Sequence, residues 1–142
     1  MSTRVYSEIN VHITWHTKGS VPMIGTAMEA QLHSFLRSKV IETRGAYFHA
    51  VGGVETHIHL TASVKPSVHL DEWIGQLKGA SSHEFGKSLQ WQTGYGIVSF
   101  GTKDLKWVVV SFSSSVSIIT RAPSMIGWSV LMTTRTGHLR GR

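Results

Sequence analysis

The order in which hydrophobic periods follow one another constrains the fold of this chain most. Residues 9–17, INVHITWHT, alternate apolar and polar side chains, as a half-buried strand does. Residues 26–43 carry an apolar side chain every four positions, which predicts an amphipathic helix. Residues 46–51 and 56–64 predict two further strands, the second of them in an apolar run rich in β-branched residues. The glycine pair between these strands favours a turn or a bulge.

The second half of the domain repeats this order. Residues 65–87 predict a second helix, residues 95–101 a fourth strand, and the segment from Thr102 a third helix. The sequence strand, helix, strand, strand, helix, strand, helix is that of the ferredoxin-like split βαβ sandwich. We therefore expect an α+β fold, in which an antiparallel sheet carries its helices on one face.

Polar residues at the helix starts predict capping interactions. Thr26 is followed three residues later by Glu29, the spacing of a capping box. Ser67 precedes the second helix and Thr102 the third, and both are expected to act as N-caps.

Charge and composition narrow the classes of function. The 142 residues carry a formal net charge of +6, which favours a polyanionic partner, most often nucleic acid, although a basic surface without a partner is the alternative. The chain has no cysteine, so disulfides, thiolate metal sites and cysteine nucleophiles are excluded. No apolar run reaches the length of a membrane span, and the first residues lack the layout of a signal peptide. We expect a cytoplasmic protein with no membrane partner.

Two histidines in the third strand are the main candidate site. His57 and His59 flank Ile58, so their side chains share one face of the strand. Two neutral imidazoles at this spacing can bind one divalent cation if a third ligand comes from elsewhere. The alternative is a pair of polar residues on a solvated face. His12 and His16 on the first strand carry the same ambiguity, and we expect them to be surface residues or DNA contacts.

Three longer stretches surround these histidines in a specific order. They are HITWHTKGSVPMI at residues 12–24, HAVGGVETHIHLTASVKPSVHLDEWIGQLKGASS at 49–82 and WQTGYGIVSFGTKDL at 91–105. Over about residues 6–109 the chain resembles the HUH nucleases, and more closely the single-tyrosine transposases of bacterial insertion sequences of the 200/605 group.

The resemblance implies DNA transposition by cleavage and joining of single-stranded DNA at hairpin-bearing element ends, through a 5′-phosphotyrosine intermediate. His57 and His59 would hold Mg²⁺ or Mn²⁺, which polarises the scissile phosphate. The resemblance also implies a homodimer, in which the tyrosine helix reaches the histidine pair of the second copy.

The resemblance also suggests DNA contacts outside the histidine pair. Lys78, Ser81 and Ser82 match a family motif and would contact phosphate, whereas the alternative is a solvated helix end. Trp91 and Tyr95 can stack on bases, although Tyr95 is expected to pack against its strand.

The match fails where the family has its nucleophile. Ser111, or Phe112 with a slip of one residue, stands at the tyrosine position, and Ser115 stands at the position of a glutamine that serves as third metal ligand. No tyrosine follows Tyr95. Nothing in the pattern supports serine as a nucleophile, so no catalytic residue is identifiable and this copy is predicted to be catalytically defective.

The composition of the tail suggests a cause. All eight acidic residues lie at or before Asp104, and residues 110–142 contain no Asp, Glu or Lys. We hypothesise a frameshift near Val110, which divides the chain into a transposase-like domain at 1–109 and an aberrant tail at 110–142. The tail would replace the catalytic helix and the C-terminal extension. The coding DNA around Val110 tests this hypothesis.

A function of a different class remains open. Ferredoxin-like sheets with exposed aromatic residues occur in RNA-recognition modules, so a non-catalytic nucleic-acid-binding module is the alternative. The glycine-aromatic signature of those modules is absent here. A metal-binding domain without nucleic acid is a third possibility, against which the net charge argues.

Overall fold

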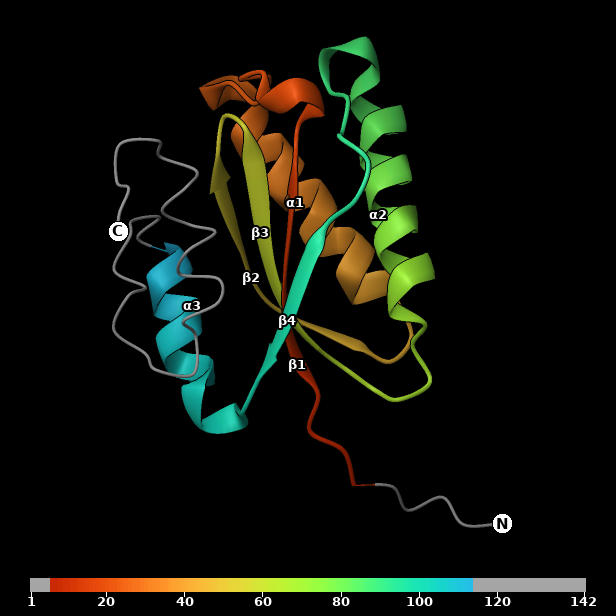
Figure 1. The fold of residues 1–142 in the computed structure, drawn as a ribbon, viewed down its shortest axis with the longest axis vertical. Coiled ribbons are helices and arrows are strands. Elements are labelled where there is room, and N and C mark those ends of the chain that lie inside the picture. Colours follow the sequence, from red (N-terminus) through yellow and green to blue (C-terminus); the bar gives the residue numbers. More distant parts are fainter. Residues whose placement is uncertain (1–5, 114–142) are drawn as a thin grey trace.

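A four-stranded antiparallel sheet forms the centre of the molecule in a computed structural model, which describes residues 6–113 (Figure 1). Its strands lie in the order β2-β3-β1-β4, so β1 is hydrogen-bonded to both β3 and β4. This order confirms the ferredoxin-like α+β fold. The strands are β1 (Asn10–His16), β2 (Ala46–Val54), β3 (His57–Val64) and β4 (Gly96–Phe100).

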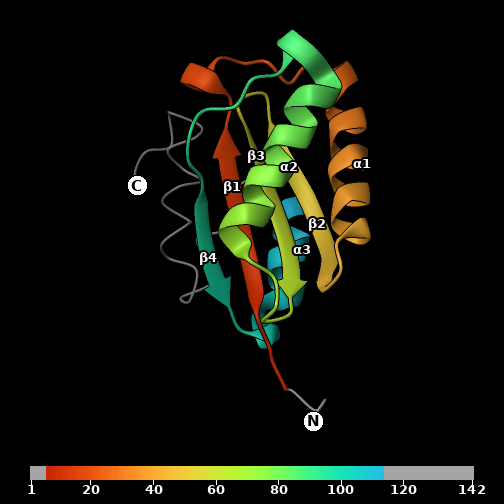
Figure 2. The same ribbon diagram turned by 90° about the vertical axis from the view of Figure 1, so that its right-hand side faces the viewer.

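Helices lie on both faces of this sheet (Figures 1 and 2). The helices α1 (Thr26–Glu42) and α2 (Leu70–Phe85) cover one face, as expected of the two βαβ units. The helix α3 (Leu105–Ser113) packs on the other face, against β2 and β3. The expectation that the sheet carries its helices on one face is therefore wrong for α3, which the order of elements along the chain does not distinguish from the other two helices. Single 3₁₀ turns form η1 (Lys18–Ser20), η2 (Gly86–Ser88) and η3 (Thr102–Asp104).

The larger hydrophobic core lies between the sheet and the α1 and α2 helices. Alternate residues of the two central strands point into it, because side chains change face at every step of a strand. The apolar stripes of both helices face them, as the four-residue period predicts. The buried core residues include Val11, Ile13, Trp15, Leu32, Leu36, Val40, Ile58, Leu60, Ala62, Val64, Trp73, Ile74 and Leu77.

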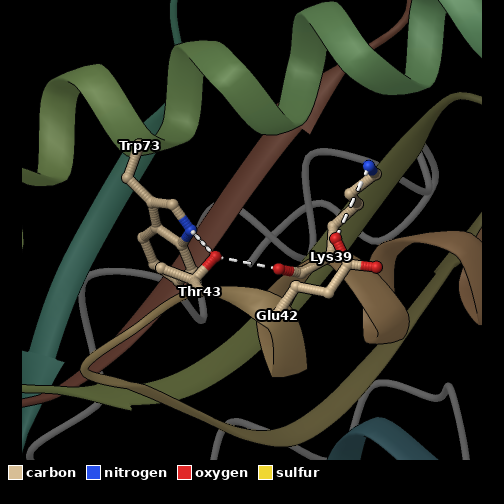
Figure 3. Close-up of polar contacts among 4 residues, drawn as sticks. All are labelled: Lys39, Glu42, Thr43 and Trp73. Atoms are coloured by element: carbon tan, nitrogen blue, oxygen red, sulfur yellow. Dashed lines mark hydrogen bonds and ion pairs between the residues drawn. The ribbon is translucent and has the colours of Figure 1, made fainter.

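A polar contact joins the end of α1 to the start of α2 (Figure 3). The indole Nε1 of Trp73 donates a hydrogen bond to Thr43 Oγ1 at 3.0 Å, and that hydroxyl donates to the carbonyl oxygen of Lys39 at 2.8 Å. Thr43 therefore satisfies a terminal carbonyl group of α1 and a donor of the buried Trp73 on α2 together. Lys39 also forms an ion pair with Glu42 at 3.7 Å on the exposed side of α1.

The hairpin between β2 and β3 differs from the sequence prediction. The glycines at 52 and 53 do not form the turn, because β2 continues to Val54 and pairs there with His57. The turn is the two-residue segment Glu55 and Thr56. Gly53 has φ +147, and a Cβ atom there would collide with the carbonyl oxygen of His57. Glycine is thus required for the close approach of the two strands.

The tip of this hairpin is held by the segment after β1. The carbonyl oxygen of Glu55 accepts hydrogen bonds from the amides of Met23 at 3.1 Å and Ile24 at 3.0 Å. The carbonyl oxygen of Thr56 accepts one from the amide of Thr17 at 2.8 Å. Residues 17–24 therefore fix the position at which β3 begins.

The predicted caps are wrong. Gly25 is the N-cap of α1, and no side-chain capping bond forms with Thr26. His69 precedes α2 in place of Ser67, again without a side-chain bond. Thr102 opens the η3 turn, and its hydroxyl accepts a hydrogen bond from Asn10 at 3.1 Å. Tertiary contacts thus decide where these helices begin.

The helix α3 ends at Ser113, beyond the predicted domain boundary after residue 109. Residues 114–142 of the predicted tail, among them Ser115, lie outside the described residues. Within residues 6–113, no helix combines the length and apolar composition needed to cross a bilayer.

Candidate metal and DNA site

Four histidines lie close together on the face of the sheet that α3 covers. In the β1–β3 register, His16 pairs with His57 and Thr14 pairs with His59, so their side chains project to the same side. Ring centroids are 4.9 Å apart for His16 and His57, 4.7 Å for His57 and His59, and 5.0 Å for His12 and His59. The sheet therefore brings together the two predicted metal ligands and two further imidazoles.

His57 and His59 are both buried, with 2% and 6% of their surface exposed. Their rings are almost perpendicular, at 87°. His57 Nδ1 lies 3.1 Å from Thr56 Oγ1, and His59 Nδ1 lies 3.0 Å from His12 Nε2. Binding of a metal ion through Nε2 of each ring would leave both of these contacts in place.

The expectation that His12 lies at the surface is wrong. Its side chain is 2% exposed and its ring stacks on the ring of His59 in this arrangement. Burial, followed by the charge of His57, lowers the pKa of His12 well below its usual value. His16 is half-buried, and burial lowers its pKa as well. Both imidazoles are therefore held in the neutral form at neutral pH.

The pair supplies only part of a metal site. Among the described residues, no group of three or more His, Cys, Asp or Glu side chains is arranged to hold a metal ion. Two imidazoles on one face can, in their neutral form, fill two positions of a divalent ion, and the remaining ligands of Mg²⁺ or Mn²⁺ would be oxygens. Such oxygens can come from water or from a phosphate group.

The motif predicted to contact phosphate binds a neighbouring loop of the protein. Lys78 Nζ donates to the carbonyl oxygens of Gln92 at 2.8 Å and Gly94 at 2.7 Å. Burial lowers the pKa of Lys78. Ser82 Oγ donates to the carbonyl oxygen of Leu89 at 3.2 Å. These side chains tie α2 to the segment that precedes β4.

Ser81 and Trp91 complete this attachment. Ser81 is fully buried, donates to the carbonyl oxygen of Leu77 at 2.8 Å and accepts a hydrogen bond from Trp91 Nε1 at 2.9 Å. In this arrangement the hydroxyl of Ser81 is used within the fold, and a contact with DNA stays a prediction. Trp91 packs edge-on against Trp15 at 5.8 Å and pairs with Thr17. Its ring is partly exposed and anchored in the fold.

The positions of the missing nucleophile lie on α3. Ser111 and Phe112 belong to the last turns of this helix, which is on the same face of the sheet as the histidine pair. On the same face, the aromatic residue of β4, Phe100, is buried against α3, so it does not offer a ring for base stacking.

Sequence reasoning missed His12 and Thr56 as partners of the paired imidazoles. Thr56 is adjacent to His57 in sequence, which is a usable signal. His12 lies diagonally opposite His59 once β1 and β3 are paired, and only a register prediction could have found it.

Comparisons with known proteins agree with this fold. A sequence model of the family described as transposase IS200 like matches residues 5–110. The chain is similar to a candidate transposase from Deinococcus radiodurans R1, with 17% identity, a TM-score of 0.62 and coverage of 80% of this chain and 96% of that chain.

It is also similar to a REP-associated tyrosine transposase solved with a bound REP hairpin, with 17% identity, a TM-score of 0.57 and coverage of 79% and 69%. A search of curated proteins finds no match. At these identities, the structural likeness establishes a shared fold.

Proposed function

Because the chain belongs to the family of IS200-like transposases, we propose that it binds single-stranded DNA at hairpin-bearing element ends through a metal ion on His57 and His59. The observation that carries this proposal is the placement of both imidazoles on one face, each with Nδ1 in contact with a neighbouring side chain. DNA transposition is the activity of the family, and the proposal concerns what this chain contributes to it.

His57 and His59 would hold Mg²⁺ or Mn²⁺ through their Nε2 atoms. When bound, the ion supplies Lewis-acid polarisation of the scissile phosphate. Central strands are a rigid support, because β3 is hydrogen-bonded on both sides. The pair is buried, so a phosphate can reach it only if the packing on the face of the sheet that carries α3 opens.

Hairpin DNA and a second copy of the chain are the proposed partners. The net charge of +6 supports binding to a polyanion, and a REP hairpin is bound in one of the similar structures. Homodimerisation is proposed from the family resemblance.

We further propose that this chain does not cleave DNA, because no tyrosine is placed to attack a phosphate at the pair. Tyr47 pairs with Ser63, six residues along β3 from His57, which is about 20 Å at about 3.3 Å per residue. The hydroxyl of Tyr6 donates a hydrogen bond to Glu8 Oε1 at 3.0 Å. Glu8 in turn accepts a hydrogen bond from the amide of Thr102, which follows the C-terminal end of β4.

Tyr95 is held on the opposite side of the sheet. Its hydroxyl donates to Asp71 Oδ1 at 2.6 Å, and Asp71 belongs to α2. This hydrogen bond also raises the pKa of Tyr95, which weakens it as a nucleophile at neutral pH.

A binding experiment tests the metal pair. Hairpin-bearing single-stranded DNA is titrated with the full chain, with Mn²⁺ and with EDTA, and compared with a His57→Ala/His59→Ala variant. The matched control is His83→Ala, an exposed histidine on α2. We expect Mn²⁺ to strengthen binding in the wild type and in the control, and the double variant to lose this effect. Equal binding with and without metal would favour the non-catalytic module.

An adduct assay tests the catalytic defect. Labelled hairpin DNA is incubated with protein and Mn²⁺ and run on a denaturing gel. We expect no covalent adduct with the wild type, and formation of one with Ser111→Tyr or Phe112→Tyr would support the assignment of the missing position to α3. An adduct with the wild-type chain would contradict the proposed defect.

A further inference from the structure

We propose that His12 is a positioning residue that selects the tautomer of His59, so that the His59 ring presents Nε2 to the metal ion. The inference rests on the proposed metal pair and deepens it. It concerns a residue that the sequence placed at the surface and the structure places in the interior.

The backbone sets the contact between the two rings. His12 pairs with Thr61 and Thr14 pairs with His59, so His12 and His59 are diagonal neighbours on one face of adjacent strands. Their rings stack at an interplanar angle of 24°, and His12 Nε2 lies 3.0 Å from His59 Nδ1. Both strands lie in the middle of the sheet, which leaves the rings little freedom to separate.

A hydrogen bond between two neutral imidazoles needs one protonated and one unprotonated nitrogen. Ligation of a metal through His59 Nε2 needs the lone pair on that atom, so the proton of His59 must lie on Nδ1. His59 Nδ1 then donates to His12 Nε2. If His12 Nε2 donated the hydrogen bond instead, the proton of His59 would lie on its Nε2 atom, where it blocks the metal.

The hydroxyl contact at the second ligand, His57, is of a different kind. Thr56 Oγ1 lies 3.1 Å from His57 Nδ1, and a hydroxyl can rotate to donate or to accept. An imidazole cannot change its role without moving its own proton. The contact with His12 therefore ties the tautomer of His59 to that of a second imidazole.

The test begins on the metal-free full chain, with no variant. Long-range ¹H–¹⁵N NMR of ¹⁵N-histidine-labelled protein at neutral pH identifies which nitrogen of His59 carries the proton. We expect the Nδ1–H form. Observation of the Nε2–H form in the wild type would overturn the inference.

Variants then link the tautomer to metal binding. His12→Leu removes the acceptor and His12→Gln restores one through its amide oxygen. The control is His49→Gln, which replaces another imidazole on the same face, hydrogen-bonded to Ser63 Oγ at 2.6 Å. We expect His12→Leu to populate Nε2–H at His59 and to weaken Mn²⁺ binding about 10- to 100-fold. His12→Gln is expected to recover most of the Nδ1–H form of His59 and most of the Mn²⁺ affinity. The control, His49→Gln, is expected to match the wild type.

The two proposals fail in different ways. If the wild type binds no Mn²⁺, the metal pair is wrong, whatever tautomer His59 adopts. If the wild type binds Mn²⁺ and a folded His12→Leu variant binds it equally with an unchanged His59 tautomer, only the role of His12 is wrong.

Discussion

The ammonium group of Lys78 donates a hydrogen bond to the carbonyl oxygen of Gln92 at 2.8 Å, and so attaches α2 to the segment that leads into β4. The neighbouring carbonyl of Gly94 accepts a second one at 2.7 Å. Hydrogen bonds from a charged donor are stronger than neutral ones. The segment also bonds to β1, because the amide of Gln92 donates to the carbonyl oxygen of His16 at 2.8 Å.

Lys78→Met is therefore expected to loosen this segment in the absence of DNA. Loss of charged hydrogen bonds worth about 1.5–3 kcal/mol each predicts at least about tenfold faster hydrogen exchange at the Gln92 amide. Lys87→Met, in the exposed η2 turn, is the control and should leave this amide unchanged. Unchanged exchange in Lys78→Met would show that Lys78 does not hold the loop.

Gly53→Ala is expected to destabilise the domain by about 3 kcal/mol or more, because the added Cβ meets the backbone of His57 at a φ of +147. Urea unfolding measures the loss. Gly75→Ala provides a control of opposite sign, since Gly75 lies on α2 with open space around its Cβ position. Alanine should stabilise the helix there by about 0.5–1 kcal/mol. A neutral Gly53→Ala would contradict the close strand approach.

Stability is expected to fall as the pH is lowered through and below 6.5, the usual histidine pKa. Burial lowers the pKa of His12, His16, His33 and His49, so the unfolded chain binds more protons than the native state in this range. The stabilisation is thus present above pH 6.5 and is lost as the pH falls toward the folded-state values. Urea midpoints at pH 7.5 and 5.5 with EDTA measure the effect.

His12→Gln should reduce this pH dependence, because His12 is the most deeply buried of the four. A midpoint that rises on acidification would refute the prediction.

Asp71→Asn is expected to lower the pKa of Tyr95 toward 10, its usual value. The hydrogen bond to Asp71 and the charge of this carboxylate both raise the pKa in the wild type, since they disfavour the phenolate. NMR titration of the tyrosine ring carbons resolves the three tyrosines separately. Glu8→Gln should act in the same direction on Tyr6 alone, which tests the assignment. A Tyr95 pKa that does not move would rule out the contact with Asp71.

Much of the fold could be predicted because its signals are local. The alternation of residues 9–17 assigned the core face of β1 correctly, and the shared face of His57 and His59 follows from the strand period alone. The helix stripe through Leu32, Leu36 and Val40 also needed no tertiary information.

The features that were missed depend on pairing between distant segments. His12 lies on a central strand and is buried, and its contact with His59 depends on the strand register. The partners of Lys78 are carbonyl oxygens of a loop 14 and 16 residues away, which no local pattern identifies. Thr26 and Ser67 had the chemistry of caps, but the chain enters both helices without using their side chains.

The hydrogen-bonded tip of the β2–β3 hairpin has a practical consequence for engineering. Hairpin tips are usual sites for inserting tags or fluorophores, since few contacts depend on them. Here the carbonyl groups of Glu55 and Thr56 accept hydrogen bonds from Thr17, Met23 and Ile24, and the next residue is His57. An insertion at this tip would disconnect the imidazole pair from the segment that fixes its register. The exposed turn at Gly86–Ser88 is the safer place for a label.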